Sequence, residues 1–547
     1  MKSFTLEDFE KIRPITKAKE AGIELIYSTP NRVCKWRVKT LFEKEPDTIN
    51  WLRRLKPEDV LLDVGANVGM YSVFAALAQK SKVIAFEPES QNFAQLCKNI
   101  ELNKLHNQII PFCAGLSDET GLSRLHLSQF LWDGGSSCHS LNEEVGFDLK
   151  PRHSDFVQGV VSYEIDKAVK EGMMPIPQFI KIDVDGFEHK VIEGALLTLK
   201  KPEVRSLCIE VNGNLEEHKK MLSKLEKLGF YHDPLQVERS IRKEGAFVGC
   251  AEYILDRVNS RKIEIINPMK YPATAKSINK SARVAFGEII KKAESSRVET
   301  DPFPYIFIED LFPTSYYEDL LEYFPSNNQM SDLAESSRVY GNYTEPTRMV
   351  TAFNNKDFDR FQAKQRIFWD DFSKLLSSRE FIQGIIDKFK PWCSNRLATL
   401  LDADGSIQLR SDALIVSDRT NYSIGPHTDL PHRLITFLFY LPKDDNLKTF
   451  GTSIYRHKNT QFECAGGPHY KLKCFNEVAR IPFLPNSLLM FVRNNRSFHG
   501  VEPIAQEGVK RNLLINNLML VQTKENMLKQ GWKVHEKENI LKPPRLE

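Results

Sequence analysis

Apolar and polar positions alternate in blocks over the first half of the chain. From about Asp59, short apolar runs of strand length alternate with longer amphipathic segments: VLLDVGA, YSVFAALAQ, KVIAFEP, QNFAQLCKNIELN and IIPFCAGLS. The alternation resumes with PQFIKIDVDG, FEHKVIEGALLTLKK, SLCIEVNG and EEHKKMLSKLEKLGF and continues to about Arg257. Strands that alternate with helices predict βαβ units and a mostly parallel sheet. We therefore expect an α/β domain over residues 1–262.

The pattern changes after residue 300. Two helix-like segments, Tyr316–Phe324 and Phe368–Phe389, precede short strand-like runs that are broken by Gly, Pro and Asn. This order predicts a β-sandwich or jelly roll with preceding helices over residues 301–525. Residues 263–300 are polar and rich in Lys, which favours a connection, and residues 526–547 are predicted to form a polar tail.

A polar segment interrupts the first half. Residues 133–155, DGGSSCHSLNEEVGFDLKPRHSD, contain Gly and lack periodicity. Such a segment suits a loop or lid beside a site, and a surface excursion explains it equally well.

Composition narrows the class of protein. The 547 residues are 41% apolar and 27% charged, as in a globular enzyme. The 75 Lys and Arg residues are balanced by 72 Asp and Glu residues, so the chain lacks the excess of positive charge that would attract a nucleic acid. No apolar stretch reaches the length of a membrane span. The nine cysteines include no C-x-x-C motif, which predicts reduced thiols. The N-terminus lacks the pattern of a secretory signal, so we expect a cytoplasmic protein. The oligomeric state is left open.

The run LLDVGANVGMYS predicts the first site. It places Asp63 at the end of a strand, Gly65 and Gly69 in the turn, and an apolar helix after them. The turn lacks the G-x-G-x-x-G that admits a pyrophosphate, which disfavours a dinucleotide. Glu87 ends the next strand, where an acid can accept both hydroxyls of a ribose. A cofactor with a ribose but no phosphate, S-adenosylmethionine, fits these positions best.

At these residues the sequence resembles the FkbM-type class I methyltransferases, which have a Rossmann-like fold. The resemblance covers Trp51 to Asn212 and is carried by DVGANVGMYS, FEPES, AGLSD and IKIDVDGFEHKVIEGA. It implies methylation of hydroxyl groups on sugars, polyketides and related small molecules. It also implies the cofactor contacts Asp63, Gly65, Asn67, Gly69, Glu87 and Asp118. The family often has Glu where Asp185 stands.

Charged residues gather at the carboxyl end of the predicted central strands. Lys181, Asp183, Asp185 and Glu188 follow one strand, and Glu210 ends the next. Open α/β sheets bind ligands at this edge. An acceptor hydroxyl must lose its proton during methyl transfer, so we expect a base or a Mg²⁺ site among Lys181, Asp183, Glu188 and Glu210. Capping of the following helix is the alternative for Asp185 and Glu188.

The second half contains a candidate iron site. His427-x-Asp429 leads into an apolar strand, and His499 follows another strand pattern 70 residues later. Two His and one carboxylate are the ligands of the facial triad that holds Fe(II) with open positions. Arg511 opens the next strand, where a guanidinium can clamp the distal carboxylate of 2-oxoglutarate.

This order resembles the double-stranded β-helix oxygenases that depend on Fe(II) and 2-oxoglutarate, over about Pro302 to Val521. The resemblance implies His427, Asp429 and His499 as metal ligands and Arg511 as the co-substrate clamp, with Tyr422 as a helper. Leu513 stands where the family often has Ser. Because the carboxylate ligand is present, hydroxylation is favoured over halogenation.

Together the patterns predict a bifunctional tailoring enzyme. An S-adenosylmethionine-dependent O-methyltransferase would precede an Fe(II)/2-oxoglutarate oxygenase, acting on a small molecule, a glycan or a lipid-linked sugar. Two alternatives remain: one half is catalytic and the other positions substrate, or both folds serve a scaffold.

Overall fold

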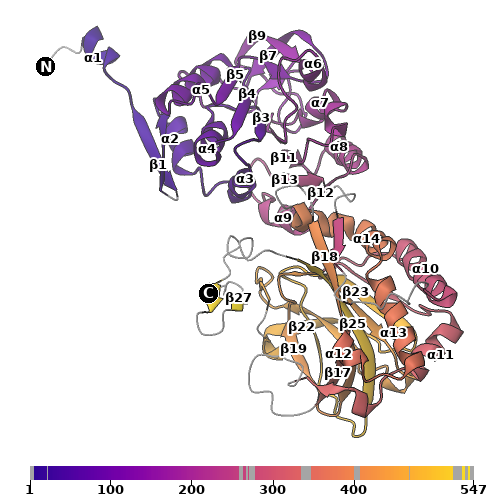
Figure 1. The fold of residues 1–547 in the computed structure, drawn as a ribbon. Helices are drawn as coiled ribbons and strands as arrows, with labels where there is room; N and C mark the ends of the chain where they lie inside the picture. Colours follow the sequence, from indigo (N-terminus) through magenta and orange to yellow (C-terminus); the bar gives the residue numbers. More distant parts are fainter. Residues whose placement is uncertain are drawn as a thin grey trace. The chain divides into compact units, whose positions relative to one another are not determined.

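The computed structural model describes residues 5–20, 22–257, 263–266, 269, 278–333, 347–398, 407–466, 469–521, 533–535 and 540–542. The chain divides into two compact units (Figure 1). The first is Met1–Asn259 with Ser394–Thr399, and the second is Ser260–Cys393 with Leu400–Glu547. Within the described residues, the structure has no helix with the length and apolar character needed to cross a membrane.

The first unit is built on a seven-stranded sheet of order β12-β13-β11-β10-β3-β4-β5. The neighbours from β11 to β5 pair in parallel, whereas β13 is antiparallel to β11 and β12. The strands are β3 (Val60–Val64), β4 (Lys82–Phe86), β5 (Ile109–Phe112), β10 (Phe179–Ile182), β11 (Ser206–Asn212), β12 (Phe230–His232) and β13 (Cys250–Arg257). All residues of β3 and β10 are buried, as expected when helices cover both faces. The predicted α/β domain with a mostly parallel sheet is confirmed.

Helices pack on the two faces of this sheet and form two apolar cores. One core includes residues of α3 (Pro46–Leu52), α4 (Met70–Gln79) and α5 (Ser90–Leu102). The other includes residues of α6 (Ile165–Lys170), α7 (Glu188–Glu193) and α8 (Glu216–Lys227). The short helix α9 (Pro234–Ser240) precedes β13.

Before the sheet, the chain forms α1 (Leu6–Glu10), a hairpin of β1 (Ile15–Glu20) and β2 (Ile23–Ser28), and α2 (Arg32–Lys39). Tyr27 fixes the hairpin to the sheet domain, because its buried hydroxyl donates a 2.9 Å hydrogen bond to the Met70 carbonyl. A small second sheet, of order β6-β9-β7-β8, consists of β6 (Gly115–Leu116), β7 (Gly121–Leu127), β8 (Ser140–Leu141) and β9 (Phe156–Tyr163).

The second unit is built on two large sheets. The larger has the order β15-β23-β20-β25-β18-β17-β16, with β14 also paired to β18, and the smaller has the order β19-β24-β21-β22. Buried residues of both sheets, including Tyr440, Leu513 and Ile454, share one apolar core, so the sheets face each other. Their strands are β14 (Ile263–Ile266), β15 (Tyr305–Ile308), β16 (Ser331–Asp332), β17 (Arg348–Ala352), β18 (Ile407–Arg419), β19 (Ile424–His427), β20 (Arg433–Tyr440), β21 (Thr452–His457), β22 (Phe475–Ile481), β23 (Ser487–Val492), β24 (His499–Val501) and β25 (Lys510–Leu520). The C-terminal region is therefore β-rich, as predicted.

In the described part of this unit, the sheets are accompanied by the helices α10 (Lys280–Ser295), α11 (Thr314–Glu322), α12 (Asn355–Phe358), α13 (Ala363–Leu376) and α14 (Arg379–Ala398). The single long helix predicted over Phe368–Phe389 is wrong, because the chain leaves the helix at Ser377 before α14 begins.

The connection predicted over 263–300 differs from the structure. Its first described residues, β14, pair in parallel with β18. Helix α10 buries Ala285, Phe286 and Ile289, and the Phe286 ring meets Phe372 of α13 at 4.9 Å. This apolar stripe, which lies at helical spacing among many lysines, makes the segment part of the second unit. Most of the predicted tail, 526–547, lies outside the described residues, and its described parts, β26 (Lys533–His535) and β27 (Ile540–Lys542), pair as antiparallel strands.

Candidate functional site

The turn after β3 is shaped by glycine. Gly65 has φ +78°, and a Cβ there would lie 2.0 Å from the carbonyl oxygen of Asp183. Gly69, with φ +80°, begins α4, and a Cβ there would lie 2.4 Å from Leu96. At Gly65 only glycine fits, because the turn lies directly against the backbone that follows β10, and the positive φ of Gly69 also favours glycine.

Glu87 is held immediately beside this turn. Its carboxylate accepts hydrogen bonds from the backbone N–H groups of Asn67 (2.7 Å) and Glu89 (2.9 Å) and, at 3.4 Å, from the side chain of Asn92. Burial raises the pKa of Glu87 to about 7, against these hydrogen bonds. Oε1 already accepts two of these hydrogen bonds and Oε2 one, so Oε2 retains acceptor capacity for a ribose hydroxyl.

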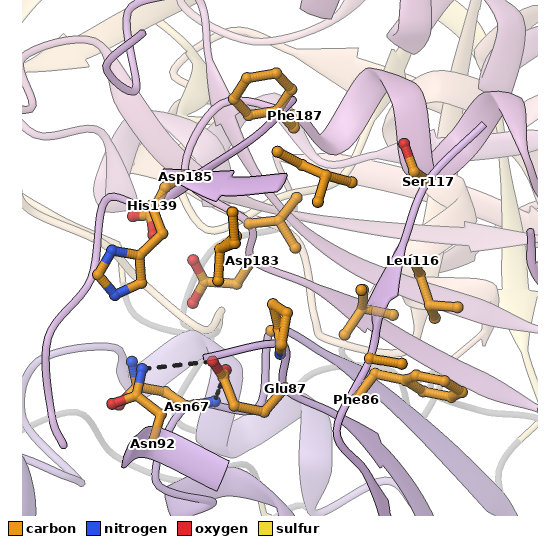
Figure 2. Close-up of a pocket in the computed structure, with 18 of the residues that line it drawn as sticks. Asn67, Phe86, Glu87, Asn92, Leu116, Ser117, His139, Asp183, Asp185 and Phe187 are labelled. Carbon is orange, nitrogen blue, oxygen red and sulfur yellow. Dashed lines mark hydrogen bonds between the residues drawn. The ribbon is translucent and has the colours of Figure 1, made fainter. Parts of the chain in front are cut away.

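A pocket of about 690 Å³ opens at Glu87 (Figure 2). Phe86, Leu116 and Phe187 provide apolar walls, and Asn67, Ser117, His139 and Asp185 provide polar ones. The segment 133–155 contributes Ser137, His139 and Leu141, so it borders a pocket, as expected of a loop beside a site. Apolar walls beside a buried acid fit an adenosine group.

Three of the predicted cofactor contacts, Asp63, Gly69 and Asp118, do not line the pocket. Asp118 is exposed and accepts from the hydroxyl of Ser117, which itself lines the pocket. Asp63 is 1% exposed, and its Oδ2 accepts from Ser72 at 2.6 Å. Its Oδ1 has no hydrogen-bond partner among the described atoms, and burial raises the pKa of this carboxyl.

A second cavity, of about 480 Å³, shares Gly65, Asn67 and Asp183 with the first. Its further lining comes from α2 and from Lys44, Glu45, Tyr71 and Lys181, among others. Asp183 accepts an ion-pair hydrogen bond from the buried Lys181 ammonium at 2.9 Å. Although burial opposes ionisation, Lys181 and Lys44 hold the pKa of Asp183 at about 2. The carboxylate is thus ionised where the two cavities meet.

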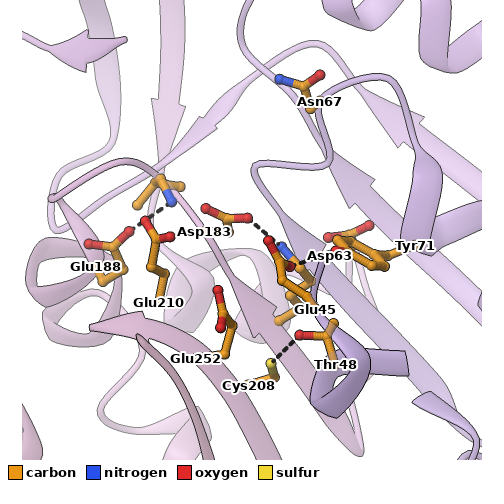
Figure 3. Close-up of polar contacts among 12 residues, drawn as sticks. Glu45, Thr48, Asp63, Asn67, Tyr71, Asp183, Glu188, Cys208, Glu210 and Glu252 are labelled. Atoms are coloured by element: carbon orange, nitrogen blue, oxygen red, sulfur yellow. Dashed lines mark hydrogen bonds and ion pairs between the residues drawn. The ribbon is translucent and has the colours of Figure 1, made fainter. Parts of the chain in front are cut away.

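Behind Asp183 lies a buried polar network that the sequence did not predict (Figure 3). Tyr71 donates its hydroxyl proton to Glu45, and the Lys181 ammonium lies 5.0 Å from the centre of the Tyr71 ring. Arg242 pairs with Glu210 at 2.9 Å and with Glu252 at 3.0 Å. No motif contains Glu45 or Arg242, and Tyr71 lies within DVGANVGMYS without a role of its own in that motif. Only their proximity in the fold shows that they belong together.

The other acids near β10 have different surroundings. Asp185 accepts from the Cys138 N–H at 2.7 Å, and burial together with Asp183 raises its pKa to about 6. The ligand atoms of Asp183, Asp185 and Glu210 lie within 4.8 Å of one another. The pKa of Glu210 lies well above its usual range, mainly because the side chain is buried and secondly because Asp183 is negatively charged.

Glu188 faces the loop and does not line either cavity. Its carboxylate accepts from the N–H groups of Val184 (2.9 Å) and Gly186 (3.0 Å), and His218 lies 3.4 Å away. Burial raises the pKa of Glu188 to about 8. Glu188 thus shapes the loop that carries Asp183 and Asp185. Helix α7 has no side-chain cap hydrogen bond, so the alternative in which Asp185 and Glu188 cap it is wrong.

In the second unit, the three predicted metal ligands converge. His427 ends β19 and pairs with His499 of β24, and with Asp429 they offer ligand atoms within 4.8 Å of one another. The Nδ1 atoms of His427 and His499 each lie 3.0 Å from a backbone carbonyl, of Gly425 and Ser497. These contacts favour the tautomer in which Nδ1–H donates to the carbonyl and Nε2 has a free electron pair that can bind a metal. The donor set fits Fe(II).

Arg511 is buried in an ion pair. Its Nη1 donates to Asp418 at 2.8 Å, its Nε donates to the Phe450 carbonyl at 2.7 Å, and its Nη2 lies 3.4 Å from the Thr452 hydroxyl. Thr452 stands two positions from Ile454, which pairs with His499, so the guanidinium lies on the triad's side of the core. The Asp418 carboxylate therefore already occupies Nη1 of the guanidinium predicted to bind 2-oxoglutarate. Nη2, whose contact with Thr452 is long, is the nitrogen with the weakest hydrogen bond.

Among the described residues, no hydrogen bond joins Tyr422 to Arg511. It is 2% exposed, and the Arg348 guanidinium lies 4.1 Å from the centre of its ring.

Comparison with known proteins addresses the first unit. Residues 63–231 match the methyltransferase FkbM domain. Hexuronic acid methyltransferase AglP of Haloferax volcanii is 28% identical over 182 residues, covering 33% of this chain and 67% of that protein. The 31-O-demethyl-FK506 methyltransferase FkbM of Streptomyces tacrolimicus is 29% identical over 178 residues, covering 29% of this chain and 67% of that protein. The crystal structure of EvdMO1 aligns with 92% of this chain and 93% of that chain, at 10% identity. Its TM-score of 0.26 does not establish a shared fold.

The chain therefore contains an FkbM-type methyltransferase domain at residues 63–231, and methyl transfer from S-adenosylmethionine is the activity supported for it. The match ends before the second unit begins.

Proposed function

We propose that the Figure 2 pocket holds the adenosine of S-adenosylmethionine, with its ribose hydroxyls on Glu87. The support is a buried carboxylate, fixed by backbone N–H groups, between apolar walls. When bound, the cofactor supplies a methyl group on a positively charged sulfur, which an acceptor oxygen displaces. Asp183 stands in the wall of both cavities, so the sulfonium end would point toward it.

The acceptor in this proposal is a hydroxyl group on a sugar or another small molecule in the second cavity. The name of one relative specifies a hexuronic acid and that of the other an O-demethylated substrate, which favours an oxygen acceptor. Asp183 stays ionised and can accept the hydrogen bond that aims the hydroxyl. Asp185, whose pKa of about 6 lies nearer to neutrality, then takes the proton. The shared position of Asp183 between the cavities carries this proposal.

Transfer of a labelled methyl group to sugar acceptors, followed by mass spectrometry of the full chain's products, tests it. Asp183→Asn should lower transfer about 100-fold or more while leaving cofactor binding intact. Asp8→Asn is the matched control, because Asp8 is exposed on α1 and lines neither cavity. Transfer that stops with EDTA and returns with Mg²⁺ would instead assign Asp183, Asp185 and Glu210 to a divalent cation, a role their spacing also suits.

For the second unit, we propose a double-stranded β-helix whose His427, Asp429 and His499 hold Fe(II) for an oxidation that consumes 2-oxoglutarate. The observation in its favour is the fixed orientation of both imidazoles toward a common point with a carboxylate. Asp429 is in turn held by Arg433 and by the Thr436 hydroxyl, which leaves its direction well defined. Release of succinate from 2-oxoglutarate by the iron-loaded full chain tests the proposal. Its absence with every acceptor would leave the second unit as a substrate-positioning module.

A further inference from the structure

The second cavity of the first unit continues past its outer wall. Trp36 and Arg37 of α2 line this cavity and also a further depression beside it, which Arg152 and Asp155 border. A path of lining residues thus leads from Asp183, where the two cavities meet, to the surface around Arg152. An acceptor bound for reaction at Asp183 would extend along α2.

The cations on this path differ in their partners. Lys44 pairs with Glu45 and Lys181 pairs with Asp183, so both ammonium groups have carboxylates. Arg37 and Arg152, in contrast, make no ion pair with a carboxylate anywhere in the described part of the chain. The path therefore offers two positive charges for a ligand.

Arg37 is also held in place. Its Nε and Nη2 donate to the Gly135 carbonyl at 3.1 and 2.9 Å. These two hydrogen bonds orient the guanidinium, and its Nη1 has no hydrogen-bond partner among the described residues. A planar guanidinium that is already fixed loses little entropy when it binds an anion.

Trp36 adds an aromatic surface next to this charge. Its side chain is 50% exposed, although Trp is usually covered, and it lines the same cavities as Arg37. An exposed indole beside a fixed guanidinium suits a ring with an apolar C–H face and an acidic substituent. Both residues precede the matched residues 63–231, so they are features of this chain's own N-terminal segment.

We infer that the acceptor is an acidic sugar whose anionic group, a carboxylate or a phosphate, binds Arg37 and Arg152 while its ring packs on Trp36. This inference rests on the proposed function of the first unit, since it places the acceptor in the cavity next to Asp183.

Calorimetric titration of the full chain, saturated with S-adenosylhomocysteine, tests it with three probes. Methyl glucuronoside and glucose 1-phosphate carry the two anionic groups, and methyl glucoside is neutral. Wild type should bind at least one anionic probe about ten-fold or more tightly than the neutral probe. The preferred anionic probe identifies carboxylate or phosphate as the source of the charge.

Variants then locate the charge. In Arg37→Ala the preference for the anionic probe should fall to within about two-fold of unity, and in Arg152→Ala it should fall in part. Lys35→Ala is the matched control, because Lys35 is an exposed cation on α2 that lines neither cavity, and it should leave the preference unchanged.

The ratio of the anionic to the neutral probe's affinity falls only if Arg37 recognises the charge. Damage to the loop that Arg37 holds would instead weaken the binding of all three probes equally. An equal loss of all probes in Arg37→Ala, or no anionic preference in wild type, would overturn the inference. If S-adenosylhomocysteine itself fails to bind, the proposed function of the first unit fails instead.

Discussion

Arg511 of β25 and Asp418 of β18 form an ion pair at 2.8 Å that is sealed from solvent, with 1% and 0% of their side chains exposed. The two residues are register partners, and Arg348 of β17 pairs with the same carboxylate. Asp418 is thus the centre of a buried cluster with two guanidinium groups. Arg511 therefore has a structural role in this cluster, in addition to any contact with a co-substrate.

Replacing Arg511 should therefore destabilise the fold. Arg511→Ala leaves the buried Asp418 with a single cation and removes the hydrogen bond to Phe450, so we expect a loss of about 3 kcal/mol in the free energy of unfolding. Denaturant unfolding measures it. Arg456→Ala, which breaks an exposed pair with Asp301, should cost less than about 1 kcal/mol. Equal small losses in both variants would mean that the buried pair contributes nothing.

Iron binding should depend on the triad and not on histidine in general. His427→Ala removes one of three ligands, so iron content after anaerobic loading should fall well below that of wild type. His457→Ala is the control, because its half-buried ring lies outside the triad and packs on Phe462. Retention of iron by His427→Ala would disprove the ligand assignment.

Glu87 should make cofactor affinity depend on pH. Burial raises its pKa from 4.5 to about 7, so the carboxyl is protonated below that pH and loses acceptor capacity for a ribose. S-Adenosylmethionine affinity should rise as the pH increases through about 7. The free energy of unfolding should fall as the pH rises from 4.5 to about 7, because over this range the folded state holds the Glu87 proton more tightly than the unfolded state does. Affinity that stays level from pH 6 to 8 would contradict the assignment.

The turn at Gly65 should tolerate no side chain. Gly65→Ala places a methyl group 2.0 Å from the Asp183 carbonyl, so the turn must move, and both stability and cofactor affinity should fall sharply. Gly172→Ala is the matched control, since Gly172 has a similar φ of +72° but nothing within 4 Å of the added Cβ. It should cost only about 1 kcal/mol, the price of the left-handed backbone alone. Thermal unfolding and titration of the two variants provide the comparison.

Much of the first site could be predicted because strand order fixes it. Gly65, Glu87 and Asp183 each follow a parallel strand, and such strand ends converge at one edge of the sheet whatever the loops do. The convergence of His427, Asp429 and His499 could be predicted from the spacing of the three residues, although Asp429 lies beyond the end of β19 and is not a strand residue.

Long-range partners could not be predicted. Arg242 follows the last helix of the first unit and meets Glu210 only because β13 returns beside β11. The partner of Arg511 lies 93 residues earlier in the chain, on a strand with no motif. Glu188 has the residue type of a base, yet its oxygens turn to the loop's N–H groups, and side-chain direction is not encoded in spacing.

Titration of the full chain with S-adenosylmethionine at pH 8 tests the central claim most directly. Wild type should bind at micromolar concentration, about −8 kcal/mol. Glu87→Ala leaves the N–H groups of Asn67 and Glu89 without their acceptor and removes the ribose contact, so affinity should fall by about 1–3 kcal/mol. Absence of binding by the folded wild type, or equal affinity in Glu87→Ala, would contradict the assignment of this pocket to S-adenosylmethionine.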